Sequence, residues 1–120
     1  MPIEYVSGDL FVNRYGAKAL AHGCNCQGSM GAGVATGFRD RYPDMYAEYR
    51  RKCKAEPRQF NLGDAWLWKA NDRPWVFNLG TQEGYCHAAH RRWLRRAIVE
   101  EGAADHRTGL RRLAVYPGRV

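Results

Sequence analysis

The stretch that decides the fold is residues 19–35, which read ALAHGCNCQGSMGAGVA. It opens with an apolar run that is typical of a buried strand and ends at His22, and a glycine-rich loop follows directly. From Gly33 onward the pattern becomes helical, because Val34 and Phe38 are four residues apart. Glycine lets the backbone approach a ligand closely, and a helix N-terminus adds N–H donors and a partial positive charge. The stretch therefore predicts a strand, a loop and a helix arranged to bind phosphate.

The order of the glycines separates this loop from two common phosphate-binding motifs. No Lys-Ser/Thr pair follows Gly33, so the loop is not a P-loop. The spacing Gly28-x-x-Gly31-x-Gly33 is the reverse of the dinucleotide-binding order. Asn25 and Gln27 favour a ligand site, because their amides can hydrogen-bond ribose hydroxyls. A purely structural turn is the alternative, since tight turns need glycine with or without a ligand.

Strand and helix signals alternate along the rest of the chain. Asp44 is the expected N-cap of a helix that carries Met45, Tyr49 and Cys53 on one face and ends before Pro57. The expected elements, in chain order, are a strand at 3–6, the strand at 19–22, a helix from residue 33, the helix after Pro43, strands at 65–69 and 74–79 around an Asn71-Asp72 turn, a helix at 87–101 and a strand at 113–116. Strands separated by helices in 120 residues predict one α/β layered domain over residues 1–120.

In layered α/β folds, ligands lie at the carboxyl ends of the strands. Two candidate segments fall there independently of any motif. One is the glycine loop, and the other is Gly80-Thr81-Gln82, which follows the strand at 74–79. We therefore expect both segments to contribute to a single site.

Composition narrows the classes of protein that fit. The hydrophobic share is 45% and the charged share 26%, which is ordinary for a globular domain. There is no apolar run of the roughly 20 residues that a membrane span needs and no signal-peptide pattern, so we expect a cytoplasmic protein with no membrane contact. The four cysteines (Cys24, Cys26, Cys53, Cys86) are then expected to be free thiols, with a zinc site or disulfides as the alternatives. We expect no metal and no cofactor.

The net charge of +7 favours polyanionic partners. Residues 85–120 contain eight of the arginines. Four of them fall on adjacent turns of the helix expected at 87–101: Arg91, Arg92, Arg95 and Arg96. These arginines predict a weak contact with nucleic acid, and a solvated helix face is the alternative interpretation.

Three segments resemble the macrodomain family, in the branch of the terminal ADP-ribose protein glycohydrolases and the ADP-ribose-1''-phosphate phosphatases. They are an opening strand with a Gly-Asp-Leu turn at 5–11, the segment 20–35 with its Cys-Asn-Cys and glycine loop, and a helix that ends in Arg41-Tyr42-Pro43. The resemblance covers roughly residues 3–100. It implies a three-layer α/β/α fold with a mixed central sheet.

The resemblance also implies a function. Members bind ADP-ribose, and this branch hydrolyses ADP-ribosyl linkages on protein or nucleic acid, which reverses ADP-ribosylation. The alternatives are a non-catalytic ADP-ribose reader and an ADP-ribose-1''-phosphate phosphatase. The family continues beyond the strand at 113–116 with a second glycine loop, a helix and a strand, so the resemblance implies a C-terminally shortened fold. An unfinished sheet exposes an edge, which makes a homodimer an expectation as well.

Site residues follow from the same resemblance. Asp9 would accept a hydrogen bond from the adenine amino group, with an Asx-turn as the alternative role. His22, Asn25 and Gln82 are the candidate catalytic residues, with His22 expected at the end of its strand. Gln82 stands where the glycohydrolases have an attacking lysine, and an amide cannot form that adduct. The expected ligand-binding residues are Gly8, Asp9, Leu10, Asn25, Gln27, Ser29, Met30, Gly31, Ala32, Gly33, Val34, Gly80, Thr81 and Gln82.

Overall fold

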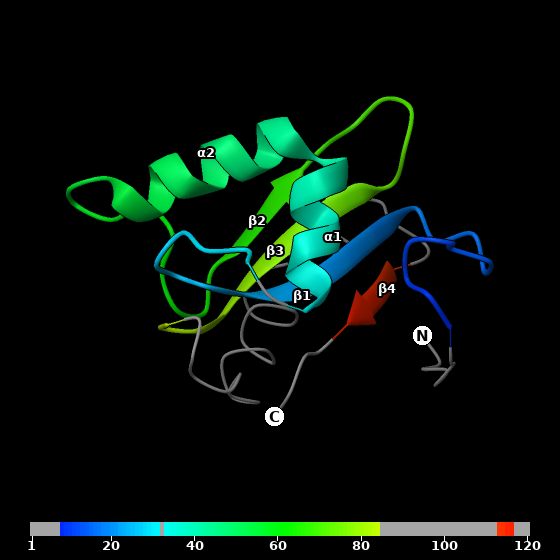
Figure 1. The fold of residues 1–120 in the computed structure, drawn as a ribbon, viewed down its shortest axis with the longest axis horizontal. Coiled ribbons are helices and arrows are strands. Elements are labelled where there is room, and N and C mark those ends of the chain that lie inside the picture. The colour runs from blue at the N-terminus through cyan, green and yellow to red at the C-terminus, as the bar shows by residue number, and fades with distance from the viewer. Residues whose placement is uncertain (1–7, 32, 85–112, 117–120) are drawn as a thin grey trace.

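A computed structural model of the protein describes residues 8–31, 33–84 and 113–116. Its centre is a sheet of four strands: β1 (Ala19–Asn25), β2 (Ala65–Trp68), β3 (Trp75–Gln82) and β4 (Leu113–Tyr116). The spatial order is β2-β3-β1-β4 (Figure 1). β1 runs parallel to β3 and to β4, and β2 runs antiparallel to β3. The mixed central sheet is therefore confirmed.

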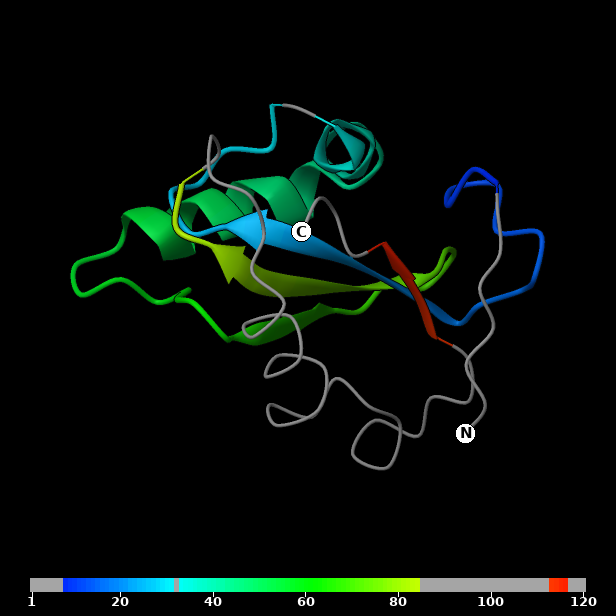
Figure 2. The same ribbon diagram turned by 90° about the horizontal axis from the view of Figure 1, so that it is seen from below.

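Two helices, α1 (Val34–Arg41) and α2 (Pro43–Lys54), cover one face of this sheet (Figure 2). α2 buries the face that the sequence predicts, with Met45, Tyr49 and Cys53 inside. The predicted N-cap is wrong, however. Tyr42 is the N-cap, because proline with its fixed φ takes the first helical position, and Asp44 lies in the first turn beside the positive end of the helix dipole.

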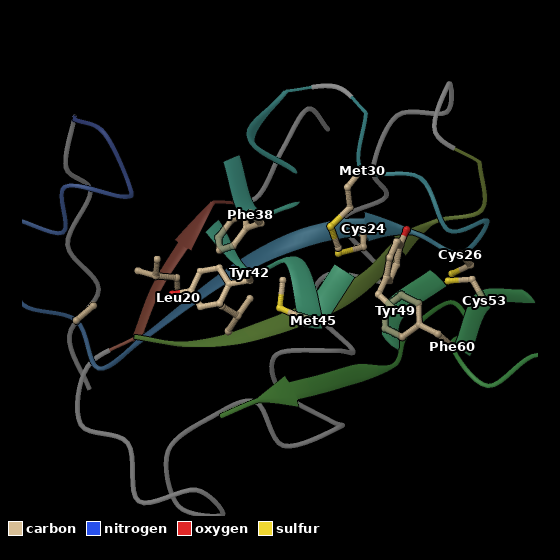
Figure 3. Packing of buried hydrophobic residues seen from close by; sticks show 12 residues of the cluster. Leu20, Cys24, Cys26, Met30, Phe38, Tyr42, Met45, Tyr49, Cys53 and Phe60 are labelled. Atoms are coloured by element: carbon tan, nitrogen blue, oxygen red, sulfur yellow. The ribbon is translucent and has the colours of Figure 1, made fainter. Parts of the chain in front are cut away.

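The core lies on both faces of the sheet. The larger cluster fills the space between the sheet and the helices, around Leu20, Phe38, Tyr42 and Tyr49 (Figure 3). A smaller cluster on the opposite face contains Ala19, Ala21, Phe77 and Leu79. Strand β1 is therefore buried on both sides, as its continuous apolar run predicts.

The other expected elements agree with the structure to different degrees. The strand at 113–116 has the predicted bounds, and the two strands around the Asn71-Asp72 turn pair antiparallel. The second of them, β3, continues three residues beyond Leu79, so residues 80–82 belong to the strand instead of following it. Strand β1 continues three residues beyond His22. The strand at 3–6, the helix at 87–101 with its arginines, and Cys86 lie outside the described residues. In the part of the chain that is described, no helix is long and apolar enough to cross a membrane.

Candidate functional site

The carboxyl ends of β1 and β3 lie side by side, because the two strands are parallel neighbours. Asn25 is aligned with Gln82 at their ends. Beyond that pair, the Cys26 backbone N–H lies within hydrogen-bond distance of the carbonyl oxygens of Gln82 and Glu83, at 3.1 Å and 3.2 Å. The glycine loop and the segment 80–82 are thus brought together, as expected from the sequence.

Asn25 is the residue that shapes the glycine loop. The register of β1 against β3 shifts between Cys24 and Asn25, where Cys24 pairs with Gly80 and Asn25 with Gln82, so that Thr81 is skipped. Its Oδ1 accepts hydrogen bonds from the backbone N–H groups of Gln27 (3.0 Å) and Ser29 (3.2 Å). Its Nδ2 donates to the Ser29 carbonyl at 2.6 Å. The sequence suggests the Asn25 amide as a contact for ribose hydroxyls. In the structure, this amide makes the hydrogen bonds that shape the loop.

Tyr49 lies in the middle of α2, and its side chain contacts the same loop. Its hydroxyl lies 2.7 Å from the Asn25 carbonyl oxygen, 2.9 Å from Asn25 Oδ1 and 3.4 Å from the Ser29 carbonyl oxygen. The side chain is fully buried, and that burial raises its pKa well above the usual tyrosine value. Tyr49 is consequently a permanent hydrogen-bond donor at neutral pH. Sequence reasoning predicted its burial and missed this contact.

The rest of the loop exposes the Gln27 side chain and the backbone at two glycines, and Ser29 is partly exposed. Met30 is buried in the core and anchors the loop, whereas Gln27, Gly31 and Gly33 are exposed. Ala32 lies outside the described residues. Gly33 is the N-cap of α1 with a φ of 62° and a ψ of −148°; no side chain caps this helix, and its first turn contains no acidic residue. The amino end of α1, next to Val34, is therefore left electrically suited to an anion.

His22 does not end its strand, which corrects the sequence expectation. It lies in the middle of β1 and is fully buried, with its ring stacked on Phe38 of α1 at a centroid distance of 3.9 Å. Its Nε2 lies 2.9 Å from Oδ1 of Asn78, its direct partner on β3. The Asn78 amide nitrogen faces the Trp66 carbonyl oxygen at 3.4 Å, so Oδ1 is the acceptor and His22 Nε2 carries the proton.

Burial lowers the pKa of His22 to about 4, against the opposing effect of the Asn78 hydrogen bond. The imidazole is therefore neutral at pH 7 and joins β1, β3 and α1 in the interior. This placement favours a structural role for His22 over the catalytic role that the resemblance implies.

The segment Gly8–Phe11 lies against α1. Oδ1 of Asp9 accepts a hydrogen bond from the Phe11 backbone N–H at 2.9 Å, which is the Asx-turn contact. Leu10 packs against the core, and the Phe11 ring meets Phe38 edge-on at 4.8 Å. Gly8 and Asp9 are exposed. In Figures 1 and 2, α1 lies between this segment and the glycine loop, so a ligand that touched both would pass over α1.

The three residues at the end of β3 have different surroundings. Gly80 is packed against the backbone of Asn61, where a Cβ would lie 2.3 Å from a carbonyl oxygen. Thr81 is fully buried against Gly23, and in the described structure its hydroxyl has no hydrogen-bond partner. Gln82 is partly exposed and donates from Nε2 to the Gly84 carbonyl at 2.9 Å. Gln82 is thus the accessible polar side chain of the three.

An ion pair next to Gln82 was not anticipated from the sequence. Arg58 binds both carboxylate oxygens of Glu83 and also donates to Asn61 Oδ1 at 2.9 Å. The pair ties the loop after α2 to the residue that follows β3. The opposite charges of the two residues are the only sequence signal for this ion pair, because 25 residues separate the two side chains in sequence.

The thiols near the loop are free. Cys24, Cys26 and Cys53 are buried, and burial raises the pKa of Cys26 to about 12 and that of Cys53 to about 11. They are therefore protonated and unreactive at neutral pH. Among the described residues, no group of three or more His, Cys, Asp or Glu side chains is placed to hold a metal ion.

Comparisons with known proteins agree with this geometry. Residues 21–100 match the Macro domain family. The ADP-ribose 1''-phosphate phosphatase of Neosartorya fischeri is 52% identical over 52 residues, which are 43% of this chain and 26% of that protein. The DNA ADP-ribosyl glycohydrolase of Mycobacterium bovis is 46% identical over 52 residues, which are 43% of this chain and 14% of that protein.

Solved structures extend the similarity over most of the chain. The macrodomain of Mycobacterium tuberculosis DarG superposes with a TM-score of 0.79 at 25% identity, over 92% of this chain and 72% of that one. Thermosipho africanus DarTG in complex with ADP-ribose gives a TM-score of 0.74 at 21% identity, over 90% of this chain and 31% of that one, and supports the fold alone. The chain spans about a quarter of the length of the first curated relatives it matches.

Proposed function

The chain belongs to the Macro domain family, and from that premise we propose that it binds ADP-ribose across the amino end of α1. The observation that carries the proposal is the order that Asn25 imposes on residues 25–29, together with the uncapped amino end of α1, whose first turn has no acidic residue. Exposed backbone N–H groups and the helix dipole at this point suit a diphosphate. The neighbouring loop residues would then hold the distal ribose.

The adenine would lie on the other side of α1, at Asp9. One oxygen of this exposed carboxylate accepts the Phe11 N–H, and a carboxylate retains further lone pairs for the adenine amino group. The Asx-turn and the adenine contact are therefore compatible roles, because the turn orients the carboxylate that the ligand would meet.

We further propose that the chain hydrolyses ADP-ribosyl linkages on protein or nucleic acid. The relatives named ADP-ribose 1''-phosphate phosphatase and DNA ADP-ribosyl glycohydrolase support a hydrolytic function. Gln82, at the end of β3, would act by orienting water, since an amide can both donate and accept hydrogen bonds but is no nucleophile. Asn25 would hold the loop around the distal ribose, and His22 would support the strand from inside.

The reader function is the second candidate, and Gln82 is the observation that favours it. Incubation with ADP-ribosylated DNA, ADP-ribosylated protein and ADP-ribose 1''-phosphate separates the candidates. A hydrolase should release ADP-ribose or phosphate from at least one of the three substrates. Binding of ADP-ribose without release from any of them would leave the reader.

Calorimetry should show micromolar binding of ADP-ribose, which corresponds to about −8 kcal/mol. The expected affinity reflects a site that is largely formed before the ligand arrives, because Asn25 already orders the loop. Undetectable binding at millimolar ligand would contradict both the hydrolase and the reader.

Replacing Asp9 by alanine should weaken ADP-ribose binding about tenfold, because a charge-assisted hydrogen bond to adenine is lost. Asp9→Asn keeps an oxygen for the Phe11 N–H and should retain more affinity. Asp40→Ala, at another exposed aspartate, is the matched control and should bind like the wild type. Equal titration curves for all four proteins would remove adenine recognition from Asp9.

We also propose two binding partners, nucleic acid and a second copy of this chain. Contact with nucleic acid through Arg91, Arg92, Arg95 and Arg96 should appear as affinity that falls steeply with salt. Homodimer formation is supported by β2 and β4, the outer strands of the sheet in the described residues, since an outer strand can pair with a second chain. Sedimentation at several concentrations measures it directly.

A further inference from the structure

We propose that Tyr49 is a positioning residue for the ligand loop, and that its hydroxyl holds residues 25–29 in the shape that binds the diphosphate and ribose. The inference rests on the proposed function of this loop and adds a residue that lies beneath the ligand, outside the loop itself. Tyr49 would contact no ligand atom and would act entirely through Asn25 and Ser29.

The geometry converges on one hydroxyl group. Three acceptors surround it: the Asn25 carbonyl oxygen at 2.7 Å, Asn25 Oδ1 at 2.9 Å and the Ser29 carbonyl oxygen at 3.4 Å. Asn25 Oδ1 in turn accepts the N–H groups of Gln27 and Ser29. The first, third and last residues of the segment 25–29 are thereby tied, directly or through Asn25, to a single point on α2.

That point lies in the packed core. Tyr49 is 0% exposed, and its ring meets Phe60 edge-on at a centroid distance of 5.7 Å. It shares the buried face of α2 with Met45 and Cys53, and Figure 3 shows its hydroxyl directed away from the helix. Burial raises the pKa of Tyr49, so the hydroxyl stays protonated and keeps its hydrogen bond. The loop is therefore anchored to the core rather than to a flexible side chain.

Removal of the hydroxyl takes a donor away from the buried Asn25 carbonyl oxygen, whereas Asn25 Oδ1 keeps the N–H groups of Gln27 and Ser29. The loop would then relax toward water, and a ligand would have to restore its shape at the expense of affinity. Loss of the hydroxyl should therefore reduce the order of the loop and its affinity for the ligand. These two effects distinguish this role from a general contribution to packing.

Tyr42 is a matched control. It is 3% exposed, packs in the same core cluster, and donates its hydroxyl to the Pro74 carbonyl oxygen at 2.8 Å. Tyr42→Phe removes the same kind of hydrogen bond from the same face of the sheet and leaves Asn25 and Ser29 in place. Both variants should lose comparable stability in urea denaturation.

The experiment compares Tyr49→Phe, Tyr42→Phe and the wild type by amide hydrogen exchange and by calorimetry with ADP-ribose. Tyr49→Phe should speed exchange at the Gln27 and Ser29 amides and weaken binding about tenfold, which corresponds to about 1.4 kcal/mol. Tyr42→Phe should leave both readouts at wild-type values. Should Tyr49→Phe fail to fold, nuclear Overhauser contacts from the wild-type Tyr49 hydroxyl proton to the Gln27 and Ser29 amide protons are expected instead.

Unchanged exchange at those two amides in Tyr49→Phe would overturn the inference, and so would faster exchange with unchanged affinity. Missing hydroxyl contacts would overturn it too. Failure of the wild type to bind ADP-ribose at all would overturn the proposed function, and the exchange data would still decide whether Tyr49 holds the loop.

Discussion

Lowering the pH from 7 to 4 should cost the folded protein about 3 kcal/mol through His22 alone. The pKa of this buried imidazole is about 4 in the native state, against about 6.5 when the chain is unfolded. Between these two values the unfolded state binds a proton that the native state does not. The neutral histidine therefore supports full stability above pH 6.5, and that stability is lost as the pH falls toward 4.

Urea denaturation at pH 7, 6, 5 and 4 measures this loss when the wild type is compared with His22→Gln. Glutamine keeps an N–H that can reach Asn78 Oδ1 and cannot be protonated in this range. The carboxylates titrate in both proteins and cancel, so the unfolding free energy of the wild type should fall by about 3 kcal/mol relative to that of His22→Gln between pH 7 and pH 4. A constant difference, or a ring that titrates near 6.5 by NMR, would contradict the assignment.

The lowered pKa of His22 also limits the part that this residue can take in hydrolysis. A histidine that stays neutral and buried can neither shuttle protons nor face a substrate at neutral pH. Any pH dependence of hydrolysis near 6.5 should therefore come from another group, and should persist in a folded His22→Gln protein.

Much of the fold could be predicted because its signals are local. The strands around the Asn71-Asp72 turn and the buried face of α2 follow from periodicity and turn chemistry within short windows. The end of β1 could not, because residues 23–25 are poor strand formers that pairing with β3 makes extended. The predicted N-cap of α2 was wrong because a proline at the first helical position places the N-cap at Tyr42, two residues before Asp44.

Some features of the site could likewise be predicted from the sequence, and others could not. Its location followed from two segments that were each predicted to come after a strand. The structure brings them together, although residues 80–82 form the end of β3 itself. The roles of individual side chains could not be predicted from the sequence, because each role depends on a partner that is far away in the chain. Asn25 meets Tyr49 from 24 residues away, and His22 meets Asn78 from 56 residues away. Neither pair can form without the strand register and helix packing that bring them together.

Gly33→Ala should weaken ADP-ribose binding by about 10- to 100-fold. Gly33 combines a φ of 62° with a ψ of −148°, a region that only glycine occupies without strain of about 1–3 kcal/mol. A Cβ at this position meets nothing within 4 Å, so the effect is conformational and not steric. The free loop of the variant would relax to an unstrained backbone, and the ligand would have to force it back. The strain therefore appears in the dissociation constant measured by calorimetry.

Gly16→Ala separates this effect from a general loss of stability. Gly16 also has a positive φ, 66°, and a Cβ there likewise meets nothing within 4 Å, but it lies in the turn before β1. Its N–H donates to the Asn13 carbonyl at 3.0 Å, away from the loop. Gly16→Ala should therefore lower the unfolding free energy and leave ADP-ribose affinity unchanged. If the two variants lost affinity equally, the backbone at Gly33 would have no special part in binding, and the amino end of α1 would lose its place as the anion site.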